Sequence, residues 1–305
     1  MNLYFSRRNV FLKAMTTEKP TLWQVRVTRR EFLRKVVPGV LTAQGISLLA
    51  AAYPVLVEPN WLDVTRVRIP IPNLPEPLNG LRIVQFSDVH LGRYTREWYL
   101  RHLVRVLGDL RPDVLVFTGD MVTRGDGAIT GWLRTFAGLQ APLGVWGVLG
   151  NHDHWTDADM VHTLIERHTP IRILRNENVR LEVEGVAFWL VGVDDAWVGA
   201  DAPDIAFAGV PEDAFRLVLM HEPDAAEWLP FTPQTLQLSG HSHGGQVRLP
   251  LVGPPLLPYL GRRYDMGLFR VRGGWLYTNR GIGVITPPIR LNCRPEVTLF
   301  TLERA

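Results

Sequence analysis

Five short polar segments hold the side chains of this sequence that are best suited to chemistry, and each follows an apolar run directly. They are Asp88-Val89-His90, Gly119-Asp120, Gly150-Asn151-His152-Asp153, His221-Glu222 and Gly240-His241-Ser242-His243. Seven of their side chains are oxygen or nitrogen donors of the kind that bind divalent cations: Asp88, His90, Asp120, Asn151, His221, His241 and His243. A donor set without sulfur fits Mn, Fe or Zn better than Cu(I) or a structural zinc site.

The spacing of these donors gives them a physical role. Asp88 and His90 stand two residues apart, as do His241 and His243. In extended backbone the side chains of residues i and i+2 point to the same side, so each pair can chelate one ion. The carboxylate of Asp120 has two oxygens and can bridge two cations about 3.5–4 Å apart, the separation of hydrolytic two-metal sites.

Glycine stands beside the proposed donors at positions 119, 150 and 240. A residue without Cβ lets the backbone turn sharply beside a ligand and leaves room for a substrate. Any one segment alone would be explained more simply, as a capping Asp or a core histidine. All five follow apolar runs, however, and five of the nine histidines fall within them. We therefore interpret them as one site.

The apolar runs predict the strands that position this site. Strands are expected at 81–86, 114–117, 145–149, 186–193, 216–220, 235–239, 275–278 and 296–302. Leucines and valines at helical spacing from Leu100 to Leu107 predict a helix over about 96–110. This alternation indicates an α/β domain, in which ligand sites lie at the carboxyl ends of strands.

The ordered series of segments resembles that of the calcineurin-like metallophosphoesterase superfamily, over about residues 80–305. The resemblance implies a two-sheet β-sandwich flanked by helices, and two divalent metal ions (Mn, Zn or Fe) that serve phosphoester hydrolysis. By position, the implied ligands are Asp88, His90 and His243 for the first metal, Asn151, His221 and His241 for the second, and Asp120 for both. It also implies that His152 contacts the phosphate and protonates the leaving oxygen.

The sequence departs from the family's pattern at one position. The family often has Gly-Asp-x-x-Asp, whereas this chain has Thr123 in place of the second Asp. That Asp usually supports the ligands, so hydrogen bonding around them is expected to differ here.

Paired arginines near the N-terminus resemble a bacterial twin-arginine export signal. Thr28-Arg29-Arg30-Glu31-Phe32-Leu33 precedes an uncharged stretch from Val36 to Val57. Together with Ser239–Val247, this start is similar to the exported phosphodiesterase branch of the superfamily, and implies passage through the twin-arginine translocase to the periplasm or cell envelope. We divide the chain into an upstream extension (1–27), a signal or membrane anchor (28–57), a Pro-rich linker (58–79) and a metallophosphoesterase domain (80–305).

The distribution of charge argues against a nucleic-acid partner. The formal net charge is +3, but nine of the 33 lysines and arginines lie in residues 1–52 with only two of the 30 acids. The remaining body holds 24 bases against 28 acids. A duplex-binding domain would carry an excess of cations. A nuclease with the same metal site is therefore disfavoured.

A proline-rich loop over residues 249–260 provides a hypothesis for the substrate. It has four prolines and no charge, so it forms neither a helix nor a central strand. Either it packs flat on the domain, or it forms an apolar lip beside the site for a substrate with an acyl or polyprenyl tail at a membrane surface. The second alternative favours a lipid-linked phosphate or pyrophosphate, such as a UDP-diacylglucosamine-like substrate.

Other residues give weaker signals. For Arg280, a contact with the substrate phosphate and a role away from it remain open alternatives. His154 is expected at the rim of the site or in packing, and Asp194-Asp195 is expected in a turn. The single Cys293 excludes an internal disulfide and is expected to be a small buried residue. A metal-loaded binding protein without turnover is the remaining alternative, which the presence of His152 disfavours.

Overall fold

The computed structural model describes residues 4–5, 10–11, 30, 34, 50–123 and 129–305. The chain divides into a unit over Met1–Tyr53 and a unit over Pro54–Ala305. In the first unit, β1 (Tyr4–Phe5) pairs antiparallel with β2 (Val10–Phe11). Most of the predicted export signal lies outside the described residues. Among the residues that are described, no helix combines the length and the apolar character needed to cross a membrane.

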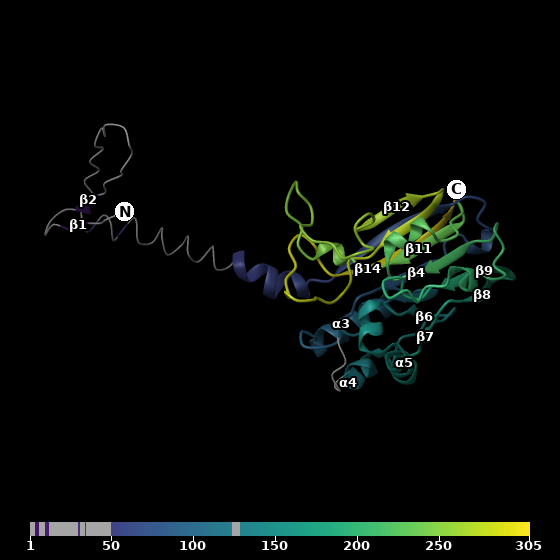
Figure 1. Ribbon diagram of the computed structural model, residues 1–305, viewed down its shortest axis with the longest axis horizontal. Helices are drawn as coiled ribbons and strands as arrows, with labels where there is room; N and C mark the ends of the chain where they lie inside the picture. The colour runs from purple at the N-terminus through teal and green to yellow at the C-terminus, as the bar shows by residue number, and fades with distance from the viewer. Residues whose placement is uncertain (1–3, 6–9, 12–29, 31–33, 35–49, 124–128) are drawn as a thin grey trace. The chain divides into compact units, whose positions relative to one another are not determined.

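Two six-stranded sheets form the core of the second unit (Figure 1). The first sheet has the order β3 (Asp63–Ile71), β14 (Glu296–Arg304), β4 (Arg82–Phe86), β5 (Val114–Thr118), β6 (Val145–Val148) and β7 (Ile171–Ile173). The second has the order β12 (Gly267–Val271), β13 (Gly274–Thr278), β11 (Thr235–Ser239), β10 (Arg216–Leu219), β9 (Val186–Gly192) and β8 (Glu177–Val183). The four strands β4 to β7 run parallel, and so do β9, β10, β11 and β13.

The central strands are apolar on both faces because each face is covered. In β4, Ile83 packs between the sheets with Phe300 of β14 and Leu238 of β11. Val84 and Phe86 of the same strand belong to a separate cluster on the opposite face. This arrangement is the helix-flanked two-sheet sandwich that the sequence resemblance implied.

Three helices cover the outer face of the first sheet: α3 (Glu97–Asp109), α4 (Ile129–Leu133) and α5 (Asn151–His168) (Figure 1). The predicted helix over 96–110 is confirmed as α3, which buries Leu100, Leu103 and Leu107. Helix α6 (Pro203–Ala206) lies against β8 of the second sheet. Short helical turns complete the chain: η2 (Tyr53–Val57), η3 (Glu58–Asn60), η4 (Glu76–Leu78), η5 (Arg134–Phe136), η6 (Pro223–Glu227) and η7 (His243–Gly245).

The segment expected to be a linker contains a strand. Over residues 58–79, β3 pairs in parallel with β14 along its whole length, and its Ile69 and Ile71 are fully buried. Pro70 is tolerated there because β3 is an edge strand and needs partners on one side only. The eight predicted strands are all present, whereas β3, β7, β8 and β12 of the second unit were not predicted. These four are short, or they alternate polar with apolar residues at the sheet edges.

Candidate metal centre

The five polar segments follow five strands and meet where the two sheets come together. Asp88 and His90 follow β4, Asp120 follows β5, and Asn151 begins α5 directly after β6. From the second sheet, His221 follows β10, and His241 and His243 follow β11. All seven proposed ligands are buried, with at most 4% of any residue exposed. The structure therefore brings every predicted ligand to one place.

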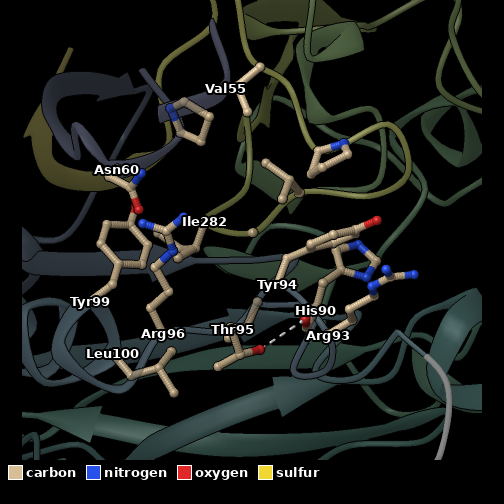
Figure 2. A pocket seen from close by; sticks show the side chains of 15 residues that line it. Val55, Asn60, His90, Arg93, Tyr94, Thr95, Arg96, Tyr99, Leu100 and Ile282 are labelled. Atoms are coloured by element: carbon tan, nitrogen blue, oxygen red, sulfur yellow. Dashed lines mark hydrogen bonds between the residues drawn. The ribbon is translucent and has the colours of Figure 1, made fainter. Parts of the chain in front are cut away.

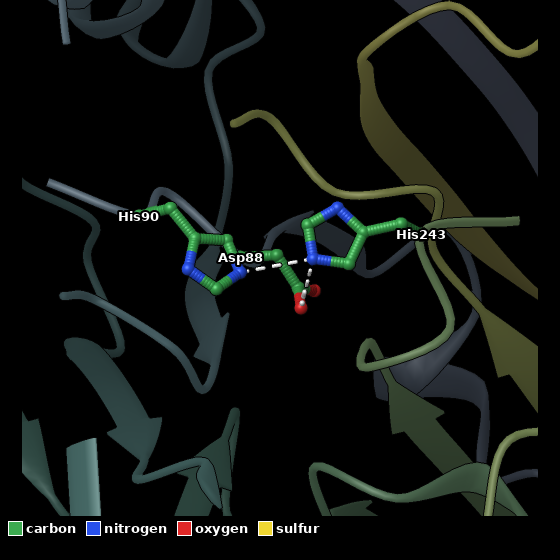
Figure 3. A group of neighbouring side chains, drawn as sticks. All are labelled: Asp88, His90 and His243. Atoms are coloured by element: carbon green, nitrogen blue, oxygen red, sulfur yellow. Dashed lines mark hydrogen bonds and ion pairs between the residues drawn. The ribbon is translucent and has the colours of Figure 1, made fainter. Parts of the chain in front are cut away.

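The first group consists of Asp88, His90 and His243, which point toward one another (Figure 3). The Nε2 atoms of the two imidazoles lie 2.9 Å apart, and Nε2 of His243 is 3.3 Å from Oδ1 of Asp88. One donor atom from each residue lies within 4.8 Å of the others. Two imidazoles and a carboxylate that converge in this way form a binding site for a divalent cation.

Asp120 lies between this group and the second one. Its Oδ2 is 3.6 Å from Nε2 of His90 and 3.3 Å from Nε2 of His221. Its Oδ1 accepts a hydrogen bond of 2.8 Å from the backbone N–H of His152. One carboxylate oxygen thus faces histidines of both groups, which is the position that a bridging ligand requires.

The second group has buried polar atoms without a hydrogen-bond partner. His221 uses Nδ1 for the carbonyl of Thr118 at 2.7 Å, so its Nε2 is free to bind a metal. That Nε2 and Oδ1 of Asn151 have no hydrogen-bond partner among the described residues. His241 uses Nε2 for the carbonyl of Tyr259 at 2.7 Å, which leaves Nδ1 as its donor atom. Buried polar atoms without partners are costly, and a cation at this point would bind both of them.

The electrostatics of the cluster place most ligands in the protonation state that metals need. Burial raises the pKa values of Asp88 and Asp120, but the neighbouring histidines outweigh it and hold both below the usual range. Burial lowers the pKa of His90 to about 3 and, with the charge of His221, that of His241 to about 3. At neutral pH the two carboxylates are therefore charged, and these two imidazoles are neutral with a free lone pair.

His221 differs from the other histidines. Burial lowers its pKa, but the carboxylate of Asp120 outweighs this effect and raises the pKa well above 6.5. The pair formed by His221 and Asp120 therefore retains a proton in the absence of a cation, and a cation bound between them would displace it.

Five of the proposed ligands have left-handed rather than extended backbone, and this conformation directs their side chains into the centre. The φ angles are 50° at Asp88, 51° at His90, 59° at Asp120, 71° at His241 and 51° at His243. The explanation of the Asp-x-His and His-x-His spacings by extended pleats was therefore wrong, although the expected convergence is correct. Residues other than glycine seldom adopt this conformation, which costs on the order of 1–3 kcal/mol at each position and is concentrated at functional sites.

Three glycines make room for the ligands themselves. A Cβ at Gly119 would lie 2.4 Å from Nδ1 of His221, and one at Gly150 would lie 2.4 Å from Oδ1 of Asp120. At Gly240 it would lie 2.3 Å from Oδ2 of Asp88. The space that the sequence analysis reserved for a substrate at these glycines is instead filled by the side chains of the centre.

Asp153 and Thr123 support the centre in roles that the sequence did not reveal. The carboxylate of Asp153 accepts hydrogen bonds from the backbone N–H groups of Met121, Val122 and Gly150, so it joins the loops after β5 and β6. Thr123, which replaces the family's second Asp, donates from Oγ1 to the carbonyl of His90 at 3.2 Å. The expected difference in hydrogen bonding at this position is therefore a bond from a threonine hydroxyl to a backbone carbonyl.

His152 is placed to contact a substrate. Its Nδ1 donates to the carbonyl of Thr123 at 2.9 Å, and this bond fixes the ring with Nε2 as the remaining nitrogen. The ring is half-buried and packs edge-on against His90, with centroids 4.8 Å apart. A donor atom of His152 also lies within 4.8 Å of donor atoms of His90 and Asp120, so the geometry allows it to bind metal as well.

The weaker candidates have structural roles. The guanidinium of Arg280 is held by Glu296 at 2.9 Å and by Asp63 at 3.1 Å, which favours a structural role over the alternative of a phosphate contact. His154 forms an ion pair of 2.7 Å with the buried Asp194. Cys293 is buried, and burial raises the pKa of its thiol, as is typical of a structural cysteine.

Comparison with known proteins agrees with this geometry. Residues 81–245 match the family described as calcineurin-like phosphoesterase. The chain is 33% identical to the uncharacterized metallophosphoesterase YkuE of Bacillus subtilis, over 91% of this chain and 98% of that protein. It is 31% identical to phosphodiesterase YaeI of Escherichia coli (90% and 99% covered) and 31% identical to the UDP-2,3-diacylglucosamine pyrophosphatase LpxG of Chlamydia trachomatis (85% and 96% covered).

The chain belongs to the calcineurin-like metallophosphoesterase family. It is a phosphoric ester hydrolase, and the alternative of a binding protein without turnover is set aside. The family assignment and the His and Asp groups agree on a dinuclear metal site.

The close approach at Gly240 yields a first prediction. Gly240→Ala should abolish metal binding, because the new Cβ would lie 2.0 Å from Oγ of Ser87 as well as against Asp88. Gly108→Ala is the matched control, since nothing lies within 4 Å of that position on α3. Elemental analysis after loading with Mn²⁺ decides the matter. Full metal content in Gly240→Ala would show that the close packing is dispensable.

A second prediction separates the bridging ligand from the proposed acid. Asp120→Ala should lose both metals, because its carboxylate faces both groups. His152→Ala should retain both metals but lose turnover by roughly 10²–10⁴-fold, the scale of a general acid. Metal content and kcat are measured on the same samples. Loss of metal from His152→Ala would instead identify His152 as a ligand.

Proposed function

We propose that this protein is a dinuclear metal-dependent phosphodiesterase or pyrophosphatase of the bacterial cell envelope that acts on a lipid-linked phosphate or pyrophosphate. The observation that carries the proposal is a cavity of about 540 Å³ whose polar floor belongs to the metal centre and whose walls are apolar. The relatives support both parts, because one is named a phosphodiesterase and another a pyrophosphatase of a diacylated nucleotide sugar.

The cavity joins the metal centre to the proline-rich loop. Its floor includes Asp120, Asn151, His152, His241 and His243. Its walls include Trp155, Trp197, Leu256, Leu257, Ile285 and Pro287. A cavity of this size and lining is typical of a site for a largely apolar ligand with a few polar contacts.

The loop over residues 249–260 does not pack flat on the domain. Leu251 is fully exposed, and Val252 and Leu256 are 75% and 80% exposed. Exposed leucines beside a hydrolytic site favour the apolar lip over the packing alternative. Such a lip would bind an acyl or polyprenyl chain while the phosphate reaches the metal centre.

The residues of the centre define the chemistry. When bound, two divalent cations lower the pKa of a water molecule and neutralise charge on the phosphoryl oxygens. Asp120 and Asn151 fix the floor of the cavity around the phosphate. His152, oriented by the carbonyl of Thr123, donates a proton from Nε2 to the oxygen that leaves phosphorus.

Export through the twin-arginine route completes the proposal and rests on the sequence over residues 28–57. That route carries folded cargo in the systems the signal resembles, so the chain would cross the inner membrane with its metals bound. Replacement of Arg29 and Arg30 by Lys should retain the protein in the cytoplasm, as measured by cell fractionation and immunoblotting. Unchanged export of the Lys-Lys variant would remove the twin-arginine part of the proposal.

The lip provides the decisive test of the substrate class. Leu256→Asp combined with Leu257→Asp should raise KM for a short-chain, monomeric lipid phosphate by at least about tenfold, because burial of one leucine contributes about 1.5–3 kcal/mol. A small soluble diester should be hydrolysed as before. Val252→Asp is the control, since Val252 is exposed on the same loop but does not line the cavity. Equal effects on both substrates would show that the loop over residues 249–260 serves packing and does not bind the lipid chain.

A further inference from the structure

Exposed apolar side chains are concentrated in two stretches of the second unit. Among the described residues, sixteen large hydrophobic side chains are exposed, and nine of them lie within residues 55–61 and 249–259. Single exposed apolar residues are normal on a protein surface, whereas a contiguous group marks a surface that binds something. The question is therefore whether the two stretches lie together.

Backbone hydrogen bonds join the two stretches through a third segment of the chain. The N–H of Arg248, at the base of the proline-rich loop, donates to the carbonyl of Leu291 at 2.8 Å. The preceding residue, Arg290, donates from its N–H to the carbonyl of Pro54 at 2.8 Å. The three segments therefore form one surface, which we call the apolar face: residues 54–61, 249–260 and 282–292.

The apolar face presents no charge to the solvent. Its only charged residues are Glu58 and Arg290, and both are buried. Glu58 accepts a hydrogen bond from the backbone N–H of Cys293, and Arg290 donates to four backbone carbonyls, so both charges serve the fold. A surface of this composition is unfavourable in water and favourable at the boundary between the headgroups and the acyl chains of a lipid bilayer.

A tight hairpin carries the most exposed part of the apolar face. Leu249 and Gly253 exchange two backbone hydrogen bonds of 2.9 Å, which leaves Leu251 and Val252 at the tip. Leu251 has a left-handed φ of 65°, a conformation that glycine or asparagine adopts at lower cost. Neither tip residue lines the cavity over the metal centre. A protruding tip of two aliphatic side chains fits insertion among lipids, whereas a stable protein interface buries about 800 Å² on each partner.

Cationic and aromatic side chains border the apolar face. The exposed Arg93 and Arg96 line a cavity of about 310 Å³ that Val55 of the apolar face also lines. Figure 2 shows Val55 at one edge of this cavity, with the two guanidinium groups at its two sides. Trp61 is half-exposed, and the guanidinium of Arg294 lies 4.2 Å from the centre of its ring. Arginine and tryptophan around an apolar surface are typical of proteins that contact the headgroups of an anionic membrane.

We propose that the apolar face docks this enzyme onto the surface of an anionic lipid bilayer, with Leu251 and Val252 inserted among the lipids and the bordering arginines at the headgroups. The inference goes beyond the proposed substrate, because the tip lies outside the cavity over the metal centre and docking holds equally for a soluble substrate. The loop over residues 249–260 links the two sites: its tip contacts the bilayer, and its Leu256 and Leu257 line the cavity.

A fluorescent label at the tip tests insertion directly in the full-length protein. The chain's single cysteine, Cys293, is buried, so a nitrobenzoxadiazole dye will label the thiol introduced by Leu251→Cys. Vesicles of phosphatidylcholine with phosphatidylglycerol should brighten the dye and shift its emission to the blue, and brominated lipids should quench it. Vesicles of phosphatidylcholine alone should act more weakly, because they lack the anionic headgroups.

Ile205→Cys is the matched control, because Ile205 is an exposed aliphatic residue of α6 outside the apolar face. Its dye should not respond to either kind of vesicle. An equal response at positions 205 and 251, or none at position 251, would overturn the proposal. An equal response of position 251 to both kinds of vesicle would remove the arginines from it.

A second change at the tip measures the contribution of its side chains. Val252→Asp, added to the labelled Leu251→Cys protein, should raise the vesicle concentration at half-maximal dye response at least about tenfold, because burial of one aliphatic side chain is worth about that factor. Ile205→Asp in the same protein should leave this concentration unchanged. Hydrolysis of a small soluble diester should be the same in all these proteins, which shows that they are folded.

Two further outcomes are distinct from each other. A dimer in sedimentation velocity that Val252→Asp abolishes, without any dye response to vesicles, would overturn membrane docking and assign the apolar face to a second copy of the chain. A protein whose label inserts, but whose KM for a monomeric lipid phosphate does not respond to the Leu256 and Leu257 variant, would keep the docking surface and lose the lipid substrate.

Discussion

The burial of two carboxylates among five histidines is the constraint on which the rest of the structure depends. Asp88 and Asp120 are almost completely buried and charged, and Oδ2 of Asp120 lies close to histidines from both sheets. Such a cluster is stable only with compensating positive charge, from protons or from cations. The strands end where they do so that these groups converge, and the left-handed backbone and the glycines follow from the short distances among them.

A buried guanidinium helps to maintain that backbone geometry. Arg290 is fully buried and donates to the carbonyls of Arg280, Gly281, Gly283 and Cys293. The loop thus held returns two bonds to the first ligand segment, from the N–H groups of Ile282 and Gly283 to the carbonyls of Ser87 and Asp88. Asp153 does the same for the loops after β5 and β6. Rigid support of this kind keeps strained ligands in place when the charge on them changes.

The surroundings of the centre differ between its two sides. One side opens into an apolar cavity with Trp155, Trp197 and Leu256 in its walls, and the other into a cavity with Arg93 and Arg96. Trp197 contacts both His241 and Trp155 edge-on, so the aromatic wall packs directly against a residue of the centre.

The sequence by itself identified the side chains that cluster at the centre, the eight predicted strands and helix α3. Metal chemistry restricts donor types, and buried strands must be apolar, so both leave local signals that need no neighbour to be recognised. Only the tertiary structure decided that β3 belongs to the sheet, because edge strands alternate polar with apolar residues and Pro70 masked the pattern. It alone paired Arg280 with Glu296 and gathered Arg93, Arg96 and Tyr99 around one cavity. Whether an arginine pairs with a carboxylate or lines a cavity depends on residues far away in the chain. The residues next to an arginine in the sequence do not show which distant residues will contact it.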